Sequence, residues 1–313
     1  MKKWAPLLWL AIVGIAMTIL WERLQTIELA DIAAELRSLP ARTLALAIAC
    51  CVASYTLVAI YEGIAVRFVS GRALRRHAFR TALIANPLGR VIGAAIVSGG
   101  ALRYRMYNAA DLPPRQIAAV IALVAMPYFL GVGWLVDIAL LLSVDEAARA
   151  LHLPVWVVVL IGVLGLAKDV GWIAFVHQRR APIQIRGTAL RLPSLPATLL
   201  QIAFGVTCVL LLATILYLLM PAEAQLSLPA FIAVYLIAVV AGQLSTVPAG
   251  LGVLEAALLL MLPQIPPAKL LGAVLAYRAI YELLPLAIAL LLLLTFETAD
   301  RRGALRARLT PRR

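Results

Sequence analysis

Charged residues are scarce in this sequence. Asp, Glu, Lys and Arg together make up 14% of the 313 residues, whereas hydrophobic residues make up 64%. No stretch is long and polar enough for a separate soluble domain, so the composition is that of a polytopic membrane protein. The sequence also lacks a GxSxG nucleophile motif and a GxxxxGK[ST] phosphate loop. We therefore do not expect an enzyme.

Cysteine and histidine, the residues of redox and metal chemistry, are also few. Each cysteine lies inside an apolar segment, where a thiol acts as a small buried hydrophobe. The three are Cys50, Cys51 and Cys208. The three histidines flank apolar segments without the spacing of metal ligands. We expect no redox role, no metal site and no cofactor.

Acidic residues are outnumbered, with 15 Asp and Glu against 28 Lys and Arg, and the net charge is +13. The basic residues form short runs between apolar segments, without the interleaved aromatic residues of a nucleic-acid-binding face. Such runs are typical of cytoplasmic loops, and they also attract anionic lipid headgroups. We expect no nucleic-acid partner, and a multi-pass protein of the bacterial cytoplasmic (inner) membrane with both termini in the cytoplasm.

Long apolar runs predict an all-α polytopic membrane protein with a single membrane domain over 1–313. Residues 1–66 hold two spans, the first uncleaved, with an interfacial amphipathic helix at 27–39. The rest of the domain comprises a first repeat at 77–142, connecting spans at 155–220, a second repeat at 229–296 and a basic cytoplasmic tail at 297–313. The predicted long spans are 4–20, 44–66, 116–142, 155–176, 197–220 and 270–296.

Two apolar stretches are interrupted by glycine and proline. The first, NPLGRVIGAAIVSGGALRYRMY at 86–107, leaves only 91–97 as a clean hydrophobic run, too short to cross a bilayer. Its expected hinge residues are Asn86, Pro87 and Gly89. In the second, the expected hinge residues are Pro248, Gly250 and Gly252. We predict broken or re-entrant helices at about 80–105 and 243–262, as re-entrant hairpins or as paired short crossings.

A weak internal repeat connects these two stretches. The segment DLPPRQ at 111–116 resembles QIPPAK at 264–269, and each follows a break and precedes a long apolar span. Chance is the alternative, since Pro-Pro pairs commonly start helices. The loop arginines place the two copies in opposite orientations, which predicts an inverted-repeat helical bundle of the kind found in secondary transporters.

Polar residues at the first break are candidates for binding an anionic headgroup. Arg90 and Arg103 lie in or beside the break, and a guanidinium in a membrane needs compensation. A phosphate could supply it, helped by backbone N–H groups where a half-helix begins. The candidates are Arg90, Ser98, Gly99, Gly100, Arg103, Arg105 and Tyr107. Alternatively, Arg103 and Arg105 extend to the cytoplasmic interface.

The last span and the second break carry further charges. Arg278 and Glu282 are four residues apart, on one helical face with Tyr281, so they predict either an ion pair or a substrate contact. Glu255 follows the second break and fits a half-helix N-terminus. A coupling role is a further alternative for Glu255, Tyr281 and Glu282. We give less weight to three charged residues that we place nearer the ends of spans, namely Asp137, Lys168 and Asp169.

These motifs resemble the lysylphosphatidylglycerol synthase transmembrane-domain family, which includes the flippase domain of the multiple peptide resistance factor. The matching pieces are ANPLGRVIGAAIVSGGALRYRMY, STVPAGLGVLEAALL and AYRAIYELLPL, which begin at Ala85, Ser245 and Ala276. The resemblance implies a membrane protein that moves an anionic or aminoacylated phospholipid between leaflets. It does not imply the synthase activity, because this sequence lacks the family's aminoacyl-transferase domain and looks like a standalone member.

Two other functions remain compatible with the sequence. One is a secondary transporter for a small soluble anion. The other is an accessory membrane subunit of a lipid-modifying or glycosyl-transferring system, which implies a separate partner enzyme. The sequence leaves the lipid, the energy source and the oligomeric state open.

Overall fold

The computed structural model describes residues 37–92, 95–178, 183–185, 188–190, 193–221, 224–245, 247 and 250–295. The predicted span 4–20, most of the predicted interfacial helix 27–39, the tail 297–313 and Pro248 lie outside these residues. The described chain is helical except for a short antiparallel hairpin of β1 (Ile183–Ile185) and β2 (Thr188–Leu190). The prediction of an all-α polytopic membrane protein is confirmed.

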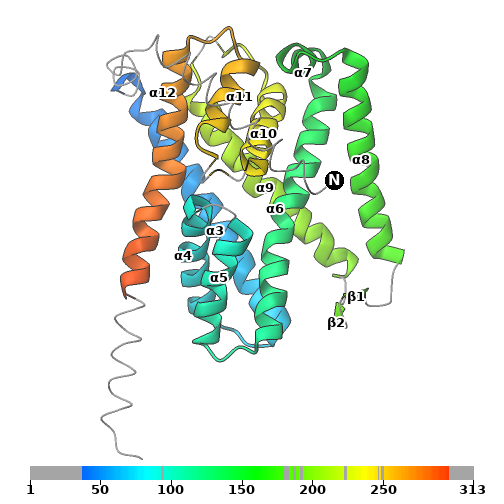
Figure 1. Ribbon diagram of the computed structural model, residues 1–313, viewed down its shortest axis with the longest axis vertical. Helices are drawn as coiled ribbons and strands as arrows, with labels where there is room; N and C mark the ends of the chain where they lie inside the picture. The colour runs from blue at the N-terminus through cyan, green and yellow to red at the C-terminus, as the bar shows by residue number, and fades with distance from the viewer. Residues whose placement is uncertain are drawn as a thin grey trace, which may run out of the picture.

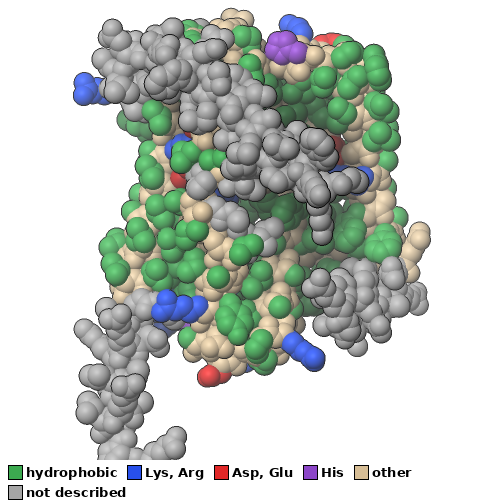
Figure 2. All heavy atoms as spheres, viewed as in Figure 1, with side chains coloured by type: hydrophobic (Ala, Val, Ile, Leu, Met, Phe, Trp, Pro, Cys, Tyr) green, Lys and Arg blue, Asp and Glu red, His purple; other side chains and the backbone are tan. Residues whose placement is uncertain are grey.

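Five described helices are long and apolar enough to cross a membrane. They are α3 (Ala41–Ser70), α6 (Pro114–Leu142), α8 (Val155–Gln178), α9 (Leu195–Leu219) and the continuous last span Pro267–Thr295. The predicted spans from 44–66 onward match them within a few residues. Hydrophobic side chains cover much of the outer surface that faces the viewer in Figure 2, as the lipid-facing side of a bundle requires.

Both predicted breaks are re-entrant hairpins. In the first, α4 (Arg75–Ile92) lies beside α5 (Ala95–Asn108), and in the second α10 (Leu228–Leu244) lies beside α11 (Val253–Met261). Figure 1 shows α4 and α5 in the lower half of the bundle and α10 and α11 in the upper half. The hairpins thus enter from opposite sides and meet near the middle.

A hairpin followed by a long span occurs twice, in opposite orientations (Figure 1). The first hairpin leads into α6, and the second leads into α12 (Pro267–Arg278), which begins the last span. Each of these helices has proline at its N-cap, Pro113 and Pro266, and again at the next position. The two Pro-Pro pairs therefore occupy equivalent places, which supports the inverted repeat.

The first break lies later in the chain than the sequence suggests. Helix α4 continues through Asn86, Pro87 and Gly89 to Ile92, so these residues are not at the turn. Packing overrides the local preference of proline and glycine. Ser98 Oγ donates to the Gly89 carbonyl at 2.9 Å, which ties α5 to α4. A Cβ at Gly99 would lie 3.1 Å from the Ala85 carbonyl oxygen, so glycine permits the close approach.

The second break follows its glycines closely. Gly250 and Gly252 have φ values of +60° and +79°, a region that residues with a side chain rarely adopt. Gly252 is the N-cap of α11. The backbone therefore reverses where the sequence places the hinge, because only glycine adopts this conformation without strain.

Helices α6 and α9 cross with their backbones nearly in contact. A Cβ built on Gly205 would lie 1.8 Å from the Pro127 carbonyl oxygen, and one on Gly131 would lie 2.2 Å from the Gly205 carbonyl carbon. Small residues at such a crossing are typical of membrane helices, where association depends on close packing. This crossing places α6 against the buried core.

We predict that Gly205→Ala destabilises the protein by about 1–3 kcal/mol or more, because the added methyl group forces the two backbones apart. Thermal unfolding of the detergent-purified protein, followed by size-exclusion chromatography, measures the effect. Gly171→Ala is the control, since a Cβ there meets nothing within 4 Å. Equal melting temperatures for the two variants would contradict the crossing.

Candidate functional site

The first hairpin carries a buried arginine that neighbouring side chains fully engage. Arg103 of α5 is 6% exposed, and Glu62 of α3 is completely buried. Nε and Nη2 of Arg103 donate to the two carboxylate oxygens of Glu62 at 3.0 and 2.9 Å, a strong bidentate pair. Arg103 Nη2 also donates to Asn86 Oδ1 at 3.1 Å, and Tyr107 Oη donates to Glu62 Oε1 at 2.9 Å. These contacts tie α3, α4 and α5 together.

A similar arginine with two carboxylates lies beside the second hairpin. Arg278, at the end of α12, donates from Nε and Nη2 to the two oxygens of Glu255 at 2.6 and 3.1 Å. Its Nη1 donates to Glu282 Oε2 at 2.9 Å, so the predicted ion pair is present. Glu255 Oε2 also accepts from the Gly252 N–H at 3.0 Å and caps α11. With all three groups ionised, this cluster has a net negative charge.

A π-helical turn, η3 (Ala279–Leu283), follows Arg278 within the last span. Such turns interrupt regular helical hydrogen bonding and are frequent at functional sites. Two side chains of α3 donate to carbonyl oxygens of this turn: Cys51 Sγ to Ile280 at 3.3 Å and Tyr55 Oη to Tyr281 at 3.4 Å. Helix α3 thus fixes the position of Tyr281.

Arg90, near the tip of the first hairpin, packs on Tyr281. Its Nη2 donates to Tyr281 Oη at 3.1 Å, and its guanidinium carbon lies 4.8 Å from the centre of the ring, a cation–π contact. Arg90 is half-buried. Within the described residues, no carboxylate forms an ion pair with it. Arg90 therefore differs from Arg103 and Arg278 in lacking an anionic partner there.

Several tyrosines surround this arginine, and we refer to them as the tyrosine cluster. Its members are Tyr55 of α3, Tyr128 of α6, Tyr235 of α10, Tyr277 of α12 and Tyr281 of η3. Tyr235 Oη and Tyr277 Oη lie 2.7 Å apart, and Gln243 of α10 donates to Tyr128 Oη. Both hairpins and three spanning helices thus contribute to one site.

The chemistry of this site suits an anion. A guanidinium with a cation–π contact keeps donors for an incoming oxyanion, and phenolic hydroxyls add further donors. Phenol rings also supply apolar surface on which the rest of a headgroup can pack. The described residues of the site include no group of three or more His, Cys, Asp or Glu side chains able to hold a metal ion.

The remaining candidates of the first hairpin are placed as follows. Helix α5 begins at Ala95, so the expectation of a half-helix start at Ser98, Gly99 and Gly100 is wrong by one turn. The Gly99 and Gly100 N–H groups lie beyond the first turn, where bonding within the helix uses them. Arg105 is exposed near the end of α5, whereas Tyr107 is fully buried against Glu62. Their role in headgroup binding stays a prediction.

Sequence reasoning does not identify some important residues. Glu62 is one, although a lone acid inside the apolar run 44–66 is a recognisable signal for a buried partner. The tyrosine cluster, apart from Tyr281, is another case, because its members lie far apart in the chain and tyrosine is common in membrane helices.

Asp137, Lys168 and Asp169 deserve more weight than the sequence suggests, since they meet between α6 and α8.

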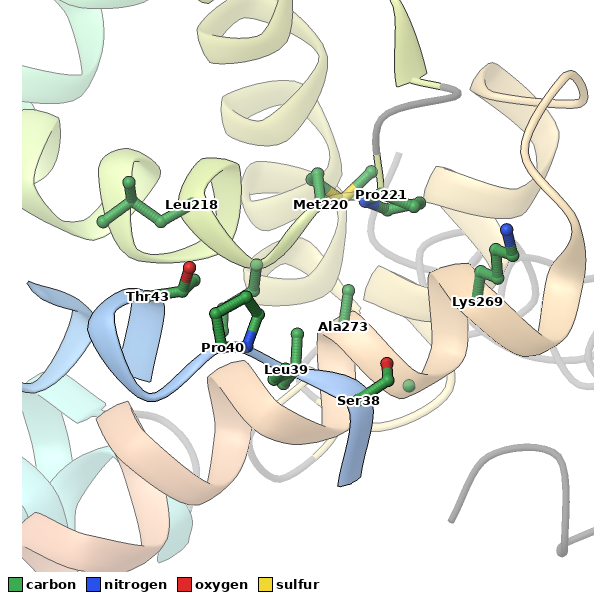
Figure 3. A pocket seen from close by; sticks show the side chains of 11 residues that line it. Ser38, Leu39, Pro40, Thr43, Leu218, Met220, Pro221, Lys269 and Ala273 are labelled. Atoms are coloured by element: carbon green, nitrogen blue, oxygen red, sulfur yellow. The ribbon is translucent and has the colours of Figure 1, made fainter. Parts of the chain in front are cut away.

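Two hollows lie away from the tyrosine cluster. One, of about 450 Å³, is lined by Arg75, Arg76, Phe79 and Arg80 at the start of α4. The other, of about 290 Å³, lies between the starts of α3 and α12 and the end of α9. Figure 3 shows Leu39, Pro40 and Ala273 close together in its lining and Lys269 to one side. They lie at opposite ends of the bundle (Figure 1).

Fold and site together define a multi-pass membrane protein with two oppositely oriented re-entrant hairpins around a buried cationic and aromatic centre. Comparison with known proteins identifies relatives of this chain, although no family model matches. The chain is 31% identical over 252 residues to an uncharacterised protein, slr0712, of Synechocystis, covering 80% of this chain and 78% of the relative. It is also 27% identical over 257 residues to the inner membrane protein YbhN of Escherichia coli, covering 80% and 79%.

A third relative is the phosphatidylglycerol lysyltransferase of Staphylococcus aureus, strain COL, which is 25% identical over 246 residues. That match covers 77% of this chain but 28% of the enzyme, and it is confined to the transmembrane domain. The chain belongs to the lysylphosphatidylglycerol synthase transmembrane-domain family. The resemblance based on the hairpin motifs is thus confirmed.

We predict that Glu62→Gln and Arg103→Gln each destabilise the protein by about 3–5 kcal/mol, because each leaves an unpaired charge in the membrane interior. The double variant is expected to lose less than the sum of the two, since it leaves neither charge. Thermal melting of the four purified proteins forms the cycle. Additive losses would show that the two side chains do not interact.

Proposed function

We propose that this protein is a lipid flippase or carrier that moves an anionic or aminoacylated phospholipid between the leaflets of the bacterial cytoplasmic membrane. The observation that carries the proposal is Arg90. It is a guanidinium at the tip of a re-entrant hairpin, surrounded by tyrosines and without a carboxylate partner among the described residues. The lipid phosphate supplies the missing negative charge.

The other two buried arginines fit a structural role better. Arg103 and Arg278 each have a bidentate carboxylate partner, and a phosphate would have to displace it. Displacement leaves a buried carboxylate unpaired, which costs several kcal/mol. Arg90 needs to give up only one hydrogen bond and a ring contact. We therefore assign the first contact with the phosphate to Arg90.

Nearby negative charge favours a headgroup that also carries an amine. Tyr281, which contacts Arg90, precedes Glu282, and the cluster of Arg278, Glu255 and Glu282 holds two carboxylates against one guanidinium. An aminoacylated headgroup presents a phosphate and an ammonium together. The lysyltransferase relative acts on phosphatidylglycerol by its name, which agrees with such a lipid.

We base the proposed movement of the lipid headgroup across the membrane on the two inverted hairpins. A headgroup crosses lipid slowly because charged groups are poorly soluble in hydrocarbon. The site between the two hairpins would open first to one side of the membrane and then to the other. Its fixed hydrogen-bond donors would replace the water around the headgroup, while the acyl chains stay in the lipid. The chain contributes no chemical step to this process, and a separate lipid-modifying enzyme would supply an aminoacylated substrate.

We also propose an orientation. Arg67, Arg72, Arg75, Arg76 and Arg115 lie at the ends of helices that share the lower side of the bundle in Figure 1. The rule that positive charge stays in the cytoplasm makes this the cytoplasmic side. The last span leads down to this side as well, and we place both termini there. The first hairpin then opens to the inner leaflet.

We predict that Arg90→Gln slows lipid translocation about tenfold or more, since a charge-assisted hydrogen bond contributes roughly 1.5–3 kcal/mol. Purified protein in liposomes with a fluorescent phosphatidylglycerol, or its aminoacylated form, and a membrane-impermeant quencher reports the rate. Arg115→Gln is the matched control, because that arginine is exposed at the start of α6. Wild-type liposomes that exchange lipid no faster than empty ones, but take up inorganic phosphate, would favour the anion transporter instead.

We predict that a cysteine at Arg76 is protected from an impermeant maleimide in intact cells, whereas one at Asp145 is labelled. Asp145 lies in the short helix α7 (Val144–Leu151) at the upper side, and both residues are exposed. Replacing Cys50, Cys51 and Cys208 gives the background. Labelling at Arg76 and protection at Asp145 would reverse the proposed orientation.

A further inference from the structure

Two spanning helices contain the same small motif and place it face to face. Helix α6 carries Gly133 and Asp137, helix α8 carries Gly165 and Asp169, and each pair is separated by three residues. A Cβ on Gly165 would lie 2.1 Å from Asp137 Oδ1, and one on Gly133 would lie 3.3 Å from Asp169 Oδ2. The carboxylate of each helix therefore lies against the glycine of the other, which indicates a built site.

Lys168 completes the cluster. Its Nζ lies 2.9 Å from Asp169 Oδ1 and 3.5 Å from Asp137 Oδ2. The two aspartates are only 4% and 5% exposed, whereas the lysine side chain is 61% exposed. Two buried carboxylates thus share one ammonium group, and the fully ionised cluster has one negative charge in excess.

Some of the carboxylate surface has no donor. Asp137 Oδ2 and Asp169 Oδ2 are both buried and form no hydrogen bond within the described residues, although Lys168 Nζ lies 3.5 Å from Asp137 Oδ2. A buried carboxylate oxygen without a donor is unfavourable by several kcal/mol if charged. A cation bonded to one of these oxygens would offset this cost.

The cluster lies within two spanning helices, with Asp137 about 8 Å along α6 from its end at Leu142. Asp169 is about 21 Å along α8 from Val155 and about 14 Å from Gln178, at about 1.5 Å per residue. At this depth an unbalanced negative charge is costly, and an ionisable group is a candidate for a coupling pathway.

We propose that Asp137 binds one proton, while Asp169 stays ionised and paired with Lys168. On uptake, the proton bonds to a carboxylate oxygen of Asp137, and the cluster becomes neutral. On release, the proton passes to water and the cluster regains its negative charge. Resting on the function proposed above, we further propose that this step couples the proton gradient to lipid movement.

A proton fits this cluster better than a metal cation does. A sodium or larger ion needs several oxygen ligands around it, as hard cations do in general. The described structure offers two buried carboxylate oxygens that form no hydrogen bond, on opposing helices, and an ammonium 3.5 Å from one of them. A proton needs only one oxygen. A metal ion would need several oxygen ligands in a place where the positive charge of Lys168 repels it.

The charged groups around Asp137 are few, so its titration belongs to this cluster. Lys168 and Asp169 of α8 are the charges that act on it. Helices α9 and α10, which also pack on α6, carry no charged residue. On the other neighbours, Glu62 of α3 is bound to Arg103 of α5, and Glu146 of α7 accepts hydrogen bonds from Ser227.

Infrared difference spectroscopy of the purified protein tests the proton site directly. An ordinary aspartate is fully ionised above about pH 6, so a protonated carboxyl band that titrates above this pH identifies the site. We expect the band in the wild type and its loss in Asp137→Asn, whereas the exposed Asp145→Asn keeps it. Absence of the band in the wild type, or its persistence in Asp137→Asn, overturns the proposal.

Two further measurements cover a variant that fails to fold and a site that binds sodium. If Asp137→Asn fails to fold, Asp169→Asn serves instead, because it leaves Lys168 to pair with Asp137 and should remove the band as well. If the melting temperature of the wild type rises with sodium but not with choline chloride, and this rise is absent in Asp137→Asn, the site binds sodium and the proton assignment is wrong.

Liposomes with an imposed pH gradient test the coupling. We expect the gradient to change the rate of lipid translocation several-fold in the wild type and to have no effect in Asp137→Asn. Equal responses of the two proteins overturn the coupling. Arg90→Gln should lose translocation under both conditions and still show the infrared band. A wild type with the band but without lipid movement retains the proton site and refutes the proposed function.

Discussion

The structure depends on one constraint, the neutralisation of guanidinium groups buried in the helical bundle. Hydrocarbon solvates neither a charge nor an unpaired backbone group, so each buried arginine needs a partner from the protein. For Arg103 that partner is Glu62 of α3, outside the hairpin, and for Arg278 it is Glu255 of α11. Each ion pair joins a hairpin to a spanning helix. These pairs hold the hairpins at a depth where their own short helices could not remain alone.

The same constraint explains why the tyrosines gather at the centre. The two hairpin ends, the π turn of the last span and helix α3 all present polar groups there, and phenol side chains satisfy them while remaining largely apolar. Tyr55 donates to a carbonyl of the π turn, and Tyr235 pairs with Tyr277. A centre built from such side chains accommodates charge without opening the bundle to water along its whole length.

Sequence reasoning locates the spans, both breaks and the inverted orientation, because hydropathy, glycine and loop arginines are local signals. It places the first break too early, since α4 stays helical through Pro87, where packing against α5 compensates for the lost backbone hydrogen bond. It also selects the arginines without their partners. Glu62 lies 41 residues before Arg103, and Asp137 and Lys168 lie on different spans, so only the tertiary structure reveals these pairs.

On the function proposed above, the difference between Arg90 and the other two arginines follows from what a carrier requires. A transport site must bind its substrate and then release it, so its resting contacts have to be weak enough to exchange. A bidentate carboxylate in a buried site is a poor resting partner, because breaking it leaves an uncompensated charge. A tyrosine ring and hydroxyl are a better one, since they hold the guanidinium in place and remain neutral when it turns to another ligand. On this proposal the three arginines divide into two that tie the hairpins to spanning helices and one, Arg90, that remains available to a headgroup.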